Sequence, residues 1–138
     1  MHPDLMPVVD LLREVAAAEI LPRFRHTAAR AKADGSLVTE ADLAVQRRIQ
    51  EGMARIQPGA PLLGEEMSGA EQEALLRHDG AVWVLDPLDG TSNFACGFPG
   101  FAISLALIEG GRAVRGAILD PVRDECFTAV LGGGAALN

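Results

Sequence analysis

The residues Val82 to Gly100 read VWVLDPLDGTSNFACGFPG, and the rest of the chain is organised around them. They begin within an apolar run, Ala81–Leu85, which is typical of a fully buried strand. The run breaks at Asp86, and a second carboxylate, Asp89, follows three residues later. Side chains at the end of a strand are held by a rigid scaffold, so we expect a functional site here.

The residue types after this strand indicate what the site binds. The carboxylates of Asp86 and Asp89 offer hard oxygen ligands, which suit Mg, Mn or Ca. Pro87 fixes its own φ and favours an extended backbone at the residue before it. Gly90 lets the backbone approach a ligand, and a helical turn starting at Thr91 or Ser92 would offer free N–H groups to an anion. Carboxylates beside such N–H groups are what metal-assisted phosphoryl hydrolysis needs, although a capped turn uses the same residue types.

Composition narrows the class of protein. A chain of 138 residues fits one domain, and 49% hydrophobic residues predict a packed core. The net charge of −7 argues against a nucleic-acid surface, so we expect no nucleic-acid partner. Cys96 and Cys126 form no zinc or C-x-x-C pattern, which favours a reduced, cytoplasmic protein. No apolar run approaches the roughly 20 residues of a membrane span, and the first ten residues lack a signal-peptide core.

The N-terminal part of the chain predicts two amphipathic helices. Apolar residues at helical spacing indicate a first helix from about Pro3, which Pro22 should kink or end. Thr39 and Asp42 resemble a capping pair, so a second helix begins near Glu40. Read locally, Asp42 is an acidic residue in the first turn of a helix.

The remaining chain predicts a short strand, a helix and an antiparallel meander. Leu62-Leu63 is a short strand that ends in Gly64-Glu65-Glu66; two acids there suit a metal, although a solvated pair is commoner. Helical sequence follows, and after the central stretch come three strand-like runs joined by turn signals. The last residues, 132–138, are too small and flexible to finish a domain, so the chain looks cut rather than ended. The bounds of these segments are 70–77 for the helix, and 101–108, 113–119 and 125–131 for the strands.

Together these elements predict an α+β domain, with two N-terminal helices packed on one face of a mostly antiparallel sheet. Such packing buries the apolar stripe of each helix and the inward residues of each strand. The expected core residues include Leu12, Val15, Val45, Ile49, Val84, Ile103, Leu105 and Ile118.

Four pieces in order resemble the inositol monophosphatase family. They are K-x-D-x-S-L-V-T-x-A-D from Lys32, L-G-E-E from Leu63, W-V-L-D-P-L-D-G-T-S-N-F from Trp83, and the meander that ends in G-G-G-A-A-L-N. The resemblance covers essentially the whole chain, and the central motif is highly specific. It implies the N-terminal domain of the layered sugar-phosphatase fold, over residues 1–138.

The resemblance also implies roles for individual residues. Metal ligands would be Glu65, Asp86, Asp89 and the carbonyl of Leu88, holding two or three Mg²⁺ ions. The substrate would contact Glu65, Asp89, Gly90, Thr91 and Ser92, with its phosphate on the backbone of Gly90 and Thr91.

Two further matches concern the attacking water and the surroundings of the site. The Thr91 hydroxyl and Asp42 would orient that water and act as the catalytic pair. Lys32 matches a lysine near the site, whose role the resemblance leaves open. Cys96 replaces a histidine often found at its position.

The implied function is Mg²⁺-dependent, lithium-sensitive hydrolysis of inositol monophosphate or a related small phosphate ester. Histidinol phosphate, fructose 1,6-bisphosphate and a 3′-phosphonucleotide remain open as substrates, as does an inactive fragment or interaction module. Members of the family are longer, and their second half carries a W-D-x-A-A-G motif with a further metal aspartate. That motif is absent here, because the only tryptophan of the sequence, Trp83, is followed by Val84. We therefore expect an N-terminal domain without the family's C-terminal α/β domain. Alone it should form a homodimer, bind Mg²⁺ weakly and turn over poorly.

Overall fold

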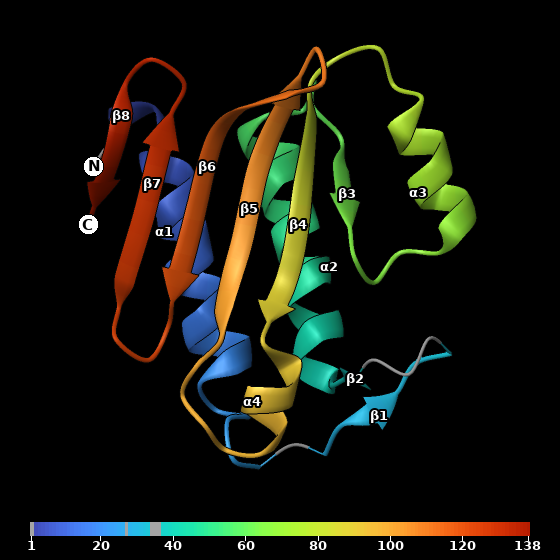
Figure 1. The fold of residues 1–138 in the computed structure, drawn as a ribbon, viewed down its shortest axis with the longest axis vertical. Coiled ribbons are helices and arrows are strands. Elements are labelled where there is room, and N and C mark those ends of the chain that lie inside the picture. The colour runs from blue at the N-terminus through green and yellow to red at the C-terminus, as the bar shows by residue number, and fades with distance from the viewer. Residues whose placement is uncertain (1, 27, 34–36) are drawn as a thin grey trace.

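A computed structural model describes residues 2–26, 28–33 and 37–138. It shows helices packed behind one face of a sheet (Figure 1), which confirms the predicted α+β architecture. The first helical segment runs through a 3-10 turn η1 (Pro3–Leu5), α1 (Met6–Val15) and a π-helical turn η2 (Ala16–Ile20), and Pro22 follows its end. The second helix, α2 (Glu40–Ile56), begins where the capping pair predicted.

Six strands form the main sheet in the order β3-β4-β5-β6-β7-β8. β3 pairs with β4 in parallel, and every other neighbouring pair is antiparallel. The turn signals predicted two of these pairs, β5 with β6 and β6 with β7. The strands are β3 (Leu62–Gly64), β4 (Val82–Asp89), β5 (Ala102–Glu109), β6 (Arg112–Asp120), β7 (Glu125–Val130) and β8 (Gly134–Leu137).

Shorter elements surround this sheet. α3 (Gly69–Leu76) flanks β3, and α4 (Thr91–Ala95) follows β4 directly. A two-residue strand β1 (Arg30–Ala31) pairs with β2 (Leu37–Val38). The turn expected at Asp34-Gly35 lies outside the described residues.

The core lies between the helices and the sheet face that they cover. Buried side chains of α1 and α2 form one apolar cluster with inward residues of β4, β5 and β6, and their removal from water drives folding. Among the predicted core residues, six are at most 1% exposed: Leu12, Val15, Val45, Ile49, Ile103 and Leu105.

Two core predictions were wrong, because α1 and α2 both cover the same face of the sheet and leave the opposite face uncovered (Figure 1). Val84 is 36% exposed and Ile118 is 47% exposed. Neighbouring side chains of a strand point to opposite faces, so the run Ala81–Leu85 is not fully buried: Trp83 and Leu85 face the helices and Val84 faces away. We call the uncovered side the open face.

The end of the chain also differs from the prediction. Residues 134–137 form the edge strand β8, paired with β7, instead of a loose tail. Strand pairing is a backbone property, so small side chains do not prevent it. The Asn138 side chain accepts hydrogen bonds from Cys126 N at 2.9 Å and from Arg13 of α1 at 3.0 Å, which ties this edge to the helical layer.

No helix in the described ranges is both long enough and apolar enough to cross a bilayer.

Candidate active site

A bulge in β4 decides where its two aspartates point. Residues three apart in a regular strand face opposite sides. Here Asp86 pairs with Ser104 and Asp89 pairs with Ala102, so two residues of β4 lie opposite one residue of β5. Because Ser104 and Ala102 are two apart on a regular strand, the bulge brings both carboxylates to the open face.

The parallel strand β3 delivers a third carboxylate. Its register continues past Gly64, where Glu65 N donates to the Leu85 carbonyl at 3.1 Å. Glu65 therefore lies beside Asp86. Burial, then the charge of Glu65 and a hydrogen bond between the two carboxyl groups, raise the pKa of Asp86 to about 7.

A lysine joins this acidic cluster. Lys32 Nζ lies 2.6 Å from Glu66 Oε1 and 3.3 Å from Glu65 Oε1. Burial raises the pKa of Glu66, and the Lys32 ammonium only partly offsets that effect. The side chain of Glu66 is 7% exposed against 48% for Glu65, so Glu66 lies inward and Glu65 faces the open site.

Asp42 serves both the helix and the site. Its Oδ2 accepts from Thr39 N at 2.7 Å, which completes the capping box of α2. Its Oδ1 accepts from Thr91 Oγ1 at 3.0 Å. The side chain is fully buried, so its two oxygens are held by protein donors.

The Thr91 hydroxyl lies within hydrogen-bond distance of two acceptors. Its oxygen also lies 3.0 Å from the Leu88 carbonyl, but it has only one proton to donate. A carboxylate is the stronger acceptor, so the proton goes to Asp42 and the Leu88 carbonyl stays available to a cation.

The turn into α4 requires a glycine. Gly90 has φ of 88°, and a Cβ there would lie 2.7 Å from the Gly100 carbonyl. The first N–H groups of α4 lack partners within the helix, so they face the same end of β4. Ser92 is exposed on this turn, while Phe94 packs against Phe24 and Phe101 and anchors α4 to the core.

Cys96 ends α4 and is exposed. Its Sγ donates to the Asn93 carbonyl at 3.3 Å. This contact is local to α4, and the role of the cysteine in the site stays open.

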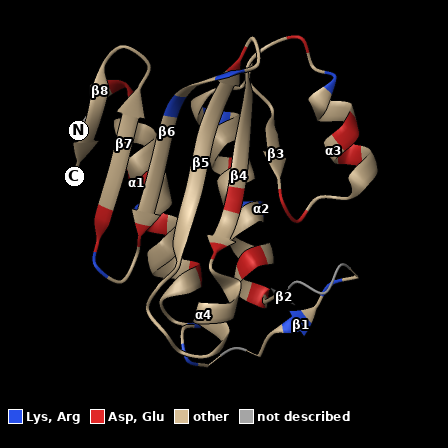
Figure 2. Cartoon of the chain, in the orientation of Figure 1, with Lys and Arg blue, Asp and Glu red and all other residues tan. Residues whose placement is uncertain are grey.

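The donor set fits a hard divalent cation in chemistry, but the three carboxylates do not form a complete cluster. Figure 2 shows acidic positions on β4, at the start of α2 and in the turn after β3. Glu65 and Asp86 are in contact, and Asp89 is exposed further along the same face. Among the residues that the structure describes, no three His, Cys, Asp or Glu side chains are placed to hold a metal ion. Metal ligation by these residues stays a prediction.

Sequence reasoning missed Gln46, which contacts the turn after β3. Its Oε1 accepts from Glu66 N at 2.7 Å. The only signal was its spacing, four residues after Asp42 on the same helix, which places both side chains on one face.

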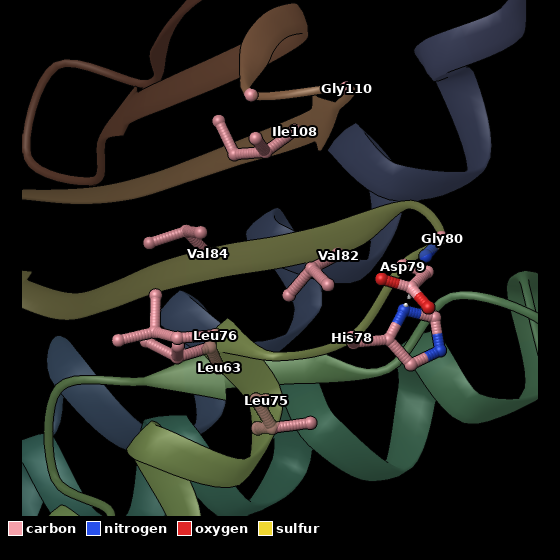
Figure 3. Close-up of a pocket in the computed structure, with 11 residues that line it drawn as sticks. Leu63, Leu75, Leu76, His78, Asp79, Gly80, Val82, Val84, Ile108 and Gly110 are labelled. Carbon is pink, nitrogen blue, oxygen red and sulfur yellow. Dashed lines mark hydrogen bonds between the residues drawn. The ribbon is translucent and has the colours of Figure 1, made fainter.

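A separate cavity of about 270 Å³ lies at the other end of β4 (Figure 3). Its walls are mainly apolar side chains of β3, α3, β4 and β5, with His78 and Asp79 at one side. It contains none of the predicted site residues, so the acidic end of β4 is the better candidate for phosphate chemistry.

Comparison with known proteins identifies the family of this chain. A family model described as the inositol monophosphatase family matches residues 4–138. An inositol-1-monophosphatase of Rhizobium meliloti is 43% identical over 108 residues, which are 78% of this chain and 39% of that protein. The Nus factor SuhB of Pseudomonas aeruginosa is 45% identical over 103 residues, 73% of this chain and 36% of that protein.

Solved structures share the fold. Thermotoga maritima IMPase superimposes with a TM-score of 0.83 at 31% identity, over 95% of this chain and 49% of that one. An IMPase/NADP phosphatase complexed with Mg²⁺ and phosphate gives 0.79 at 26% identity, over 95% and 49%.

These matches define the class of protein as an α+β phosphatase-family fold. The chain belongs to the inositol monophosphatase family. It spans about half the length of the solved structures it matches. Its match to the Rhizobium meliloti relative spans 39% of that protein's length.

Proposed function

We propose that this protein hydrolyses a small phosphomonoester with a divalent metal, and that inositol monophosphate is the substrate. The observation that carries the proposal is the 3.0 Å contact between Thr91 and the buried Asp42, next to the pair of Glu65 and Asp86. A hydroxyl held by a carboxylate, beside hard oxygen ligands, is suited to activating water. The name of the Rhizobium relative supports the choice of substrate.

Glu65, Asp86, Asp89 and the Leu88 carbonyl would hold the metal, which we propose to be Mg²⁺. When bound, a divalent cation lowers the pKa of water and stabilises charge on a phosphate. The similar IMPase/NADP phosphatase, solved as a complex with Mg²⁺ and phosphate, supports this assignment. Sensitivity to lithium is part of the same proposal.

The chain's own residues would handle the proton and the phosphate. Thr91 orients the attacking water, and its hydroxyl passes a proton to Asp42 Oδ1 as it accepts one from the water. The backbone N–H groups at Gly90 and Thr91 and the Ser92 hydroxyl bind the phosphate oxygens. The carboxylates of Glu65 and Asp89, both exposed on the open face, contact the rest of the substrate.

We propose further that residues 1–138 act as the N-terminal domain of a longer phosphatase. The coverage of about half of each solved structure supports this division. Histidinol phosphate, fructose 1,6-bisphosphate and a 3′-phosphonucleotide remain alternative substrates. A cytoplasmic location is also proposed, because Cys96 and Cys126 are both free thiols.

An interaction role is a second candidate. The Pseudomonas relative at 45% identity is named a Nus factor, and the open face of this chain exposes large apolar side chains. Under this alternative the fold is kept and turnover is lost.

A chimera separates the two functions. We would replace the matching half of Thermotoga maritima IMPase with residues 1–138 and measure phosphate release from a panel of sugar phosphates with Mg²⁺. We expect release from inositol monophosphate above the other esters, while residues 1–138 alone release little. A folded chimera that hydrolyses none of the esters, beside an active Thermotoga parent, would reject the phosphatase assignment.

A further inference from the structure

Gln46 lies on the face of α2 that carries Asp42, one helical turn further along. Asp42 reaches α4 through Thr91, and Gln46 reaches the turn after β3 through Glu66 N, which donates to its Oε1 at 2.7 Å. Gln46 is 8% exposed, although glutamine is mostly found at the surface. A buried amide of this kind needs a hydrogen-bond partner, and the Glu66 N–H supplies one.

The glutamine also fills the space beside β3. A Cβ on Gly64 would lie 2.3 Å from Gln46 Oε1, so this end of the strand is in direct contact with the amide. Gly64 and Glu66 are the two neighbours of Glu65 in the chain. Gln46 accepts a hydrogen bond from Glu66 and packs against Gly64, so it contacts the backbone on both sides of Glu65.

The side chain of Glu66 provides a second anchor. It forms the 2.6 Å ion pair with Lys32, and its backbone N–H is held by Gln46. Glu66 is therefore fixed at two points and turned inward. Glu65, the residue before it, is left facing Asp86 on the open side.

We propose that Gln46 is a positioning residue for Glu65: through the Glu66 N–H it sets the carboxylate for metal binding. The inference rests on the proposed function, because it assumes that Glu65 binds a divalent cation. It means that one helix holds the proton acceptor, Asp42, and one turn further along supports a metal ligand through Gln46. Gln46 acts through the backbone of Glu66 and is not itself a ligand.

The test compares three variants by Mn²⁺ titration, followed by the electron paramagnetic resonance signal of free Mn²⁺. Gln46→Met keeps the length of the side chain but removes the acceptor, and Gln46→Glu keeps an acceptor. Gln50→Met, at an exposed position one turn along α2, is the matched control. Loss of a residue that supports a metal ligand weakens affinity by about 10–100-fold, so we expect that loss for Gln46→Met only.

Hydrogen exchange of the Glu66 amide, measured without metal, gives an independent readout. We expect faster exchange in Gln46→Met and protection in Gln46→Glu. Unchanged Mn²⁺ affinity in Gln46→Met, despite lost protection, would overturn the positioning role. Equal loss of affinity in Gln46→Met and Gln46→Glu would also overturn it, because packing alone would then be responsible. If wild type binds no Mn²⁺, the proposed metal function fails and the inference fails with it.

Discussion

At the scale of single residues, the carboxylate of Asp42 connects the start of α2 to the proposed catalytic hydroxyl of Thr91. One oxygen closes the capping box with Thr39, and the other holds the hydroxyl of Thr91. The cap fixes the rotamer of Asp42, so in the proposed mechanism the second oxygen is already placed when substrate binds. Such preorganisation is the main way in which a fold contributes to proton transfer.

The Thr91 hydroxyl should matter more for turnover than for stability. In the chimera, we expect Thr91→Ala to lower phosphate release by about 10²–10⁴-fold, the usual worth of a proton-transfer group. Thr91→Ser keeps the hydroxyl and should retain most of the activity. Rates would be measured at saturating Mg²⁺; activity of Thr91→Ala within about tenfold of the parent chimera would remove Thr91 from the mechanism.

Asp86→Asn should separate stability from activity. Asp86 is partly buried beside Glu65, so its charge opposes folding while no cation is present. We expect the substitution to stabilise the metal-free chain by about 1 kcal/mol in urea unfolding. Turnover of the chimera should nearly vanish, and a variant that keeps both Mg²⁺ affinity and rate would contradict the metal role.

At the scale of elements, the helices and most strands followed from the sequence, and the exceptions share a cause. The capping pair at Thr39 located α2, and the apolar run Ala81–Leu85 located β4. Which face a strand buries depends on what covers it, and local sequence does not contain that information. Val84 and Ile118 were therefore placed in the core wrongly.

The site could be predicted only as a set of residues. The D-P-L-D-G motif identified Asp86 and Asp89, but the bulge that turns both to one face depends on pairing with β5. The contact between Gln46 and the turn after β3 joins segments twenty residues apart. Long-range contacts of this kind leave little trace in spacing, which is why Gln46 was missed.

An ion-pair network links the end of the first helical segment to α2. Glu19 accepts from Arg48 at 3.0 Å and also pairs with Arg23. The hydrogen bond from Arg48 has the largest effect on the pKa of Glu19 and lowers it. Burial acts in the opposite direction, but Arg48 and Arg23 together leave the pKa of Glu19 lowered. A lowered pKa stabilises the fold above the unfolded value of 4.5, and this contribution is lost as pH falls through the folded value.

Glu19→Gln should therefore destabilise the chain near pH 7, by up to about 1 kcal/mol, and have little effect near pH 3. Urea unfolding at the two pH values measures the difference. Glu14→Gln is the matched control, because Glu14 pairs with the same arginine but its side chain is 68% exposed. An equal effect of Glu19→Gln at both pH values would show that packing, and not charge, is responsible.

At the scale of the whole molecule, the open face combines the site with an apolar surface. Asp86, Ser104, Ile118, Phe127 and Leu137 pair in sequence across five strands, so they form one row on this face. The row begins at the acidic site and ends at the edge strand β8. Ile118, Phe127 and Leu137 are 47%, 48% and 51% exposed, and exposed apolar rows of this kind favour association.

We therefore predict that residues 1–138 form a homodimer through the open face. Ile118 and Phe127 are direct partners on neighbouring strands, so two charges introduced there would repel each other and also their counterparts in a second copy. The double variant Ile118→Glu/Phe127→Glu should be monomeric in sedimentation equilibrium at concentrations where wild type is dimeric. Leu21→Glu is the control and should leave the dimer intact, since Leu21 is 42% exposed at the end of the first helical segment and not on the open face. A monomeric wild type would refute the predicted dimer, and a dimer that survives the double substitution would place the interface elsewhere. Because the row starts at Asp86, a dimer through this face would also restrict access to the site, so the monomeric variant should bind Mn²⁺ at least as tightly as wild type.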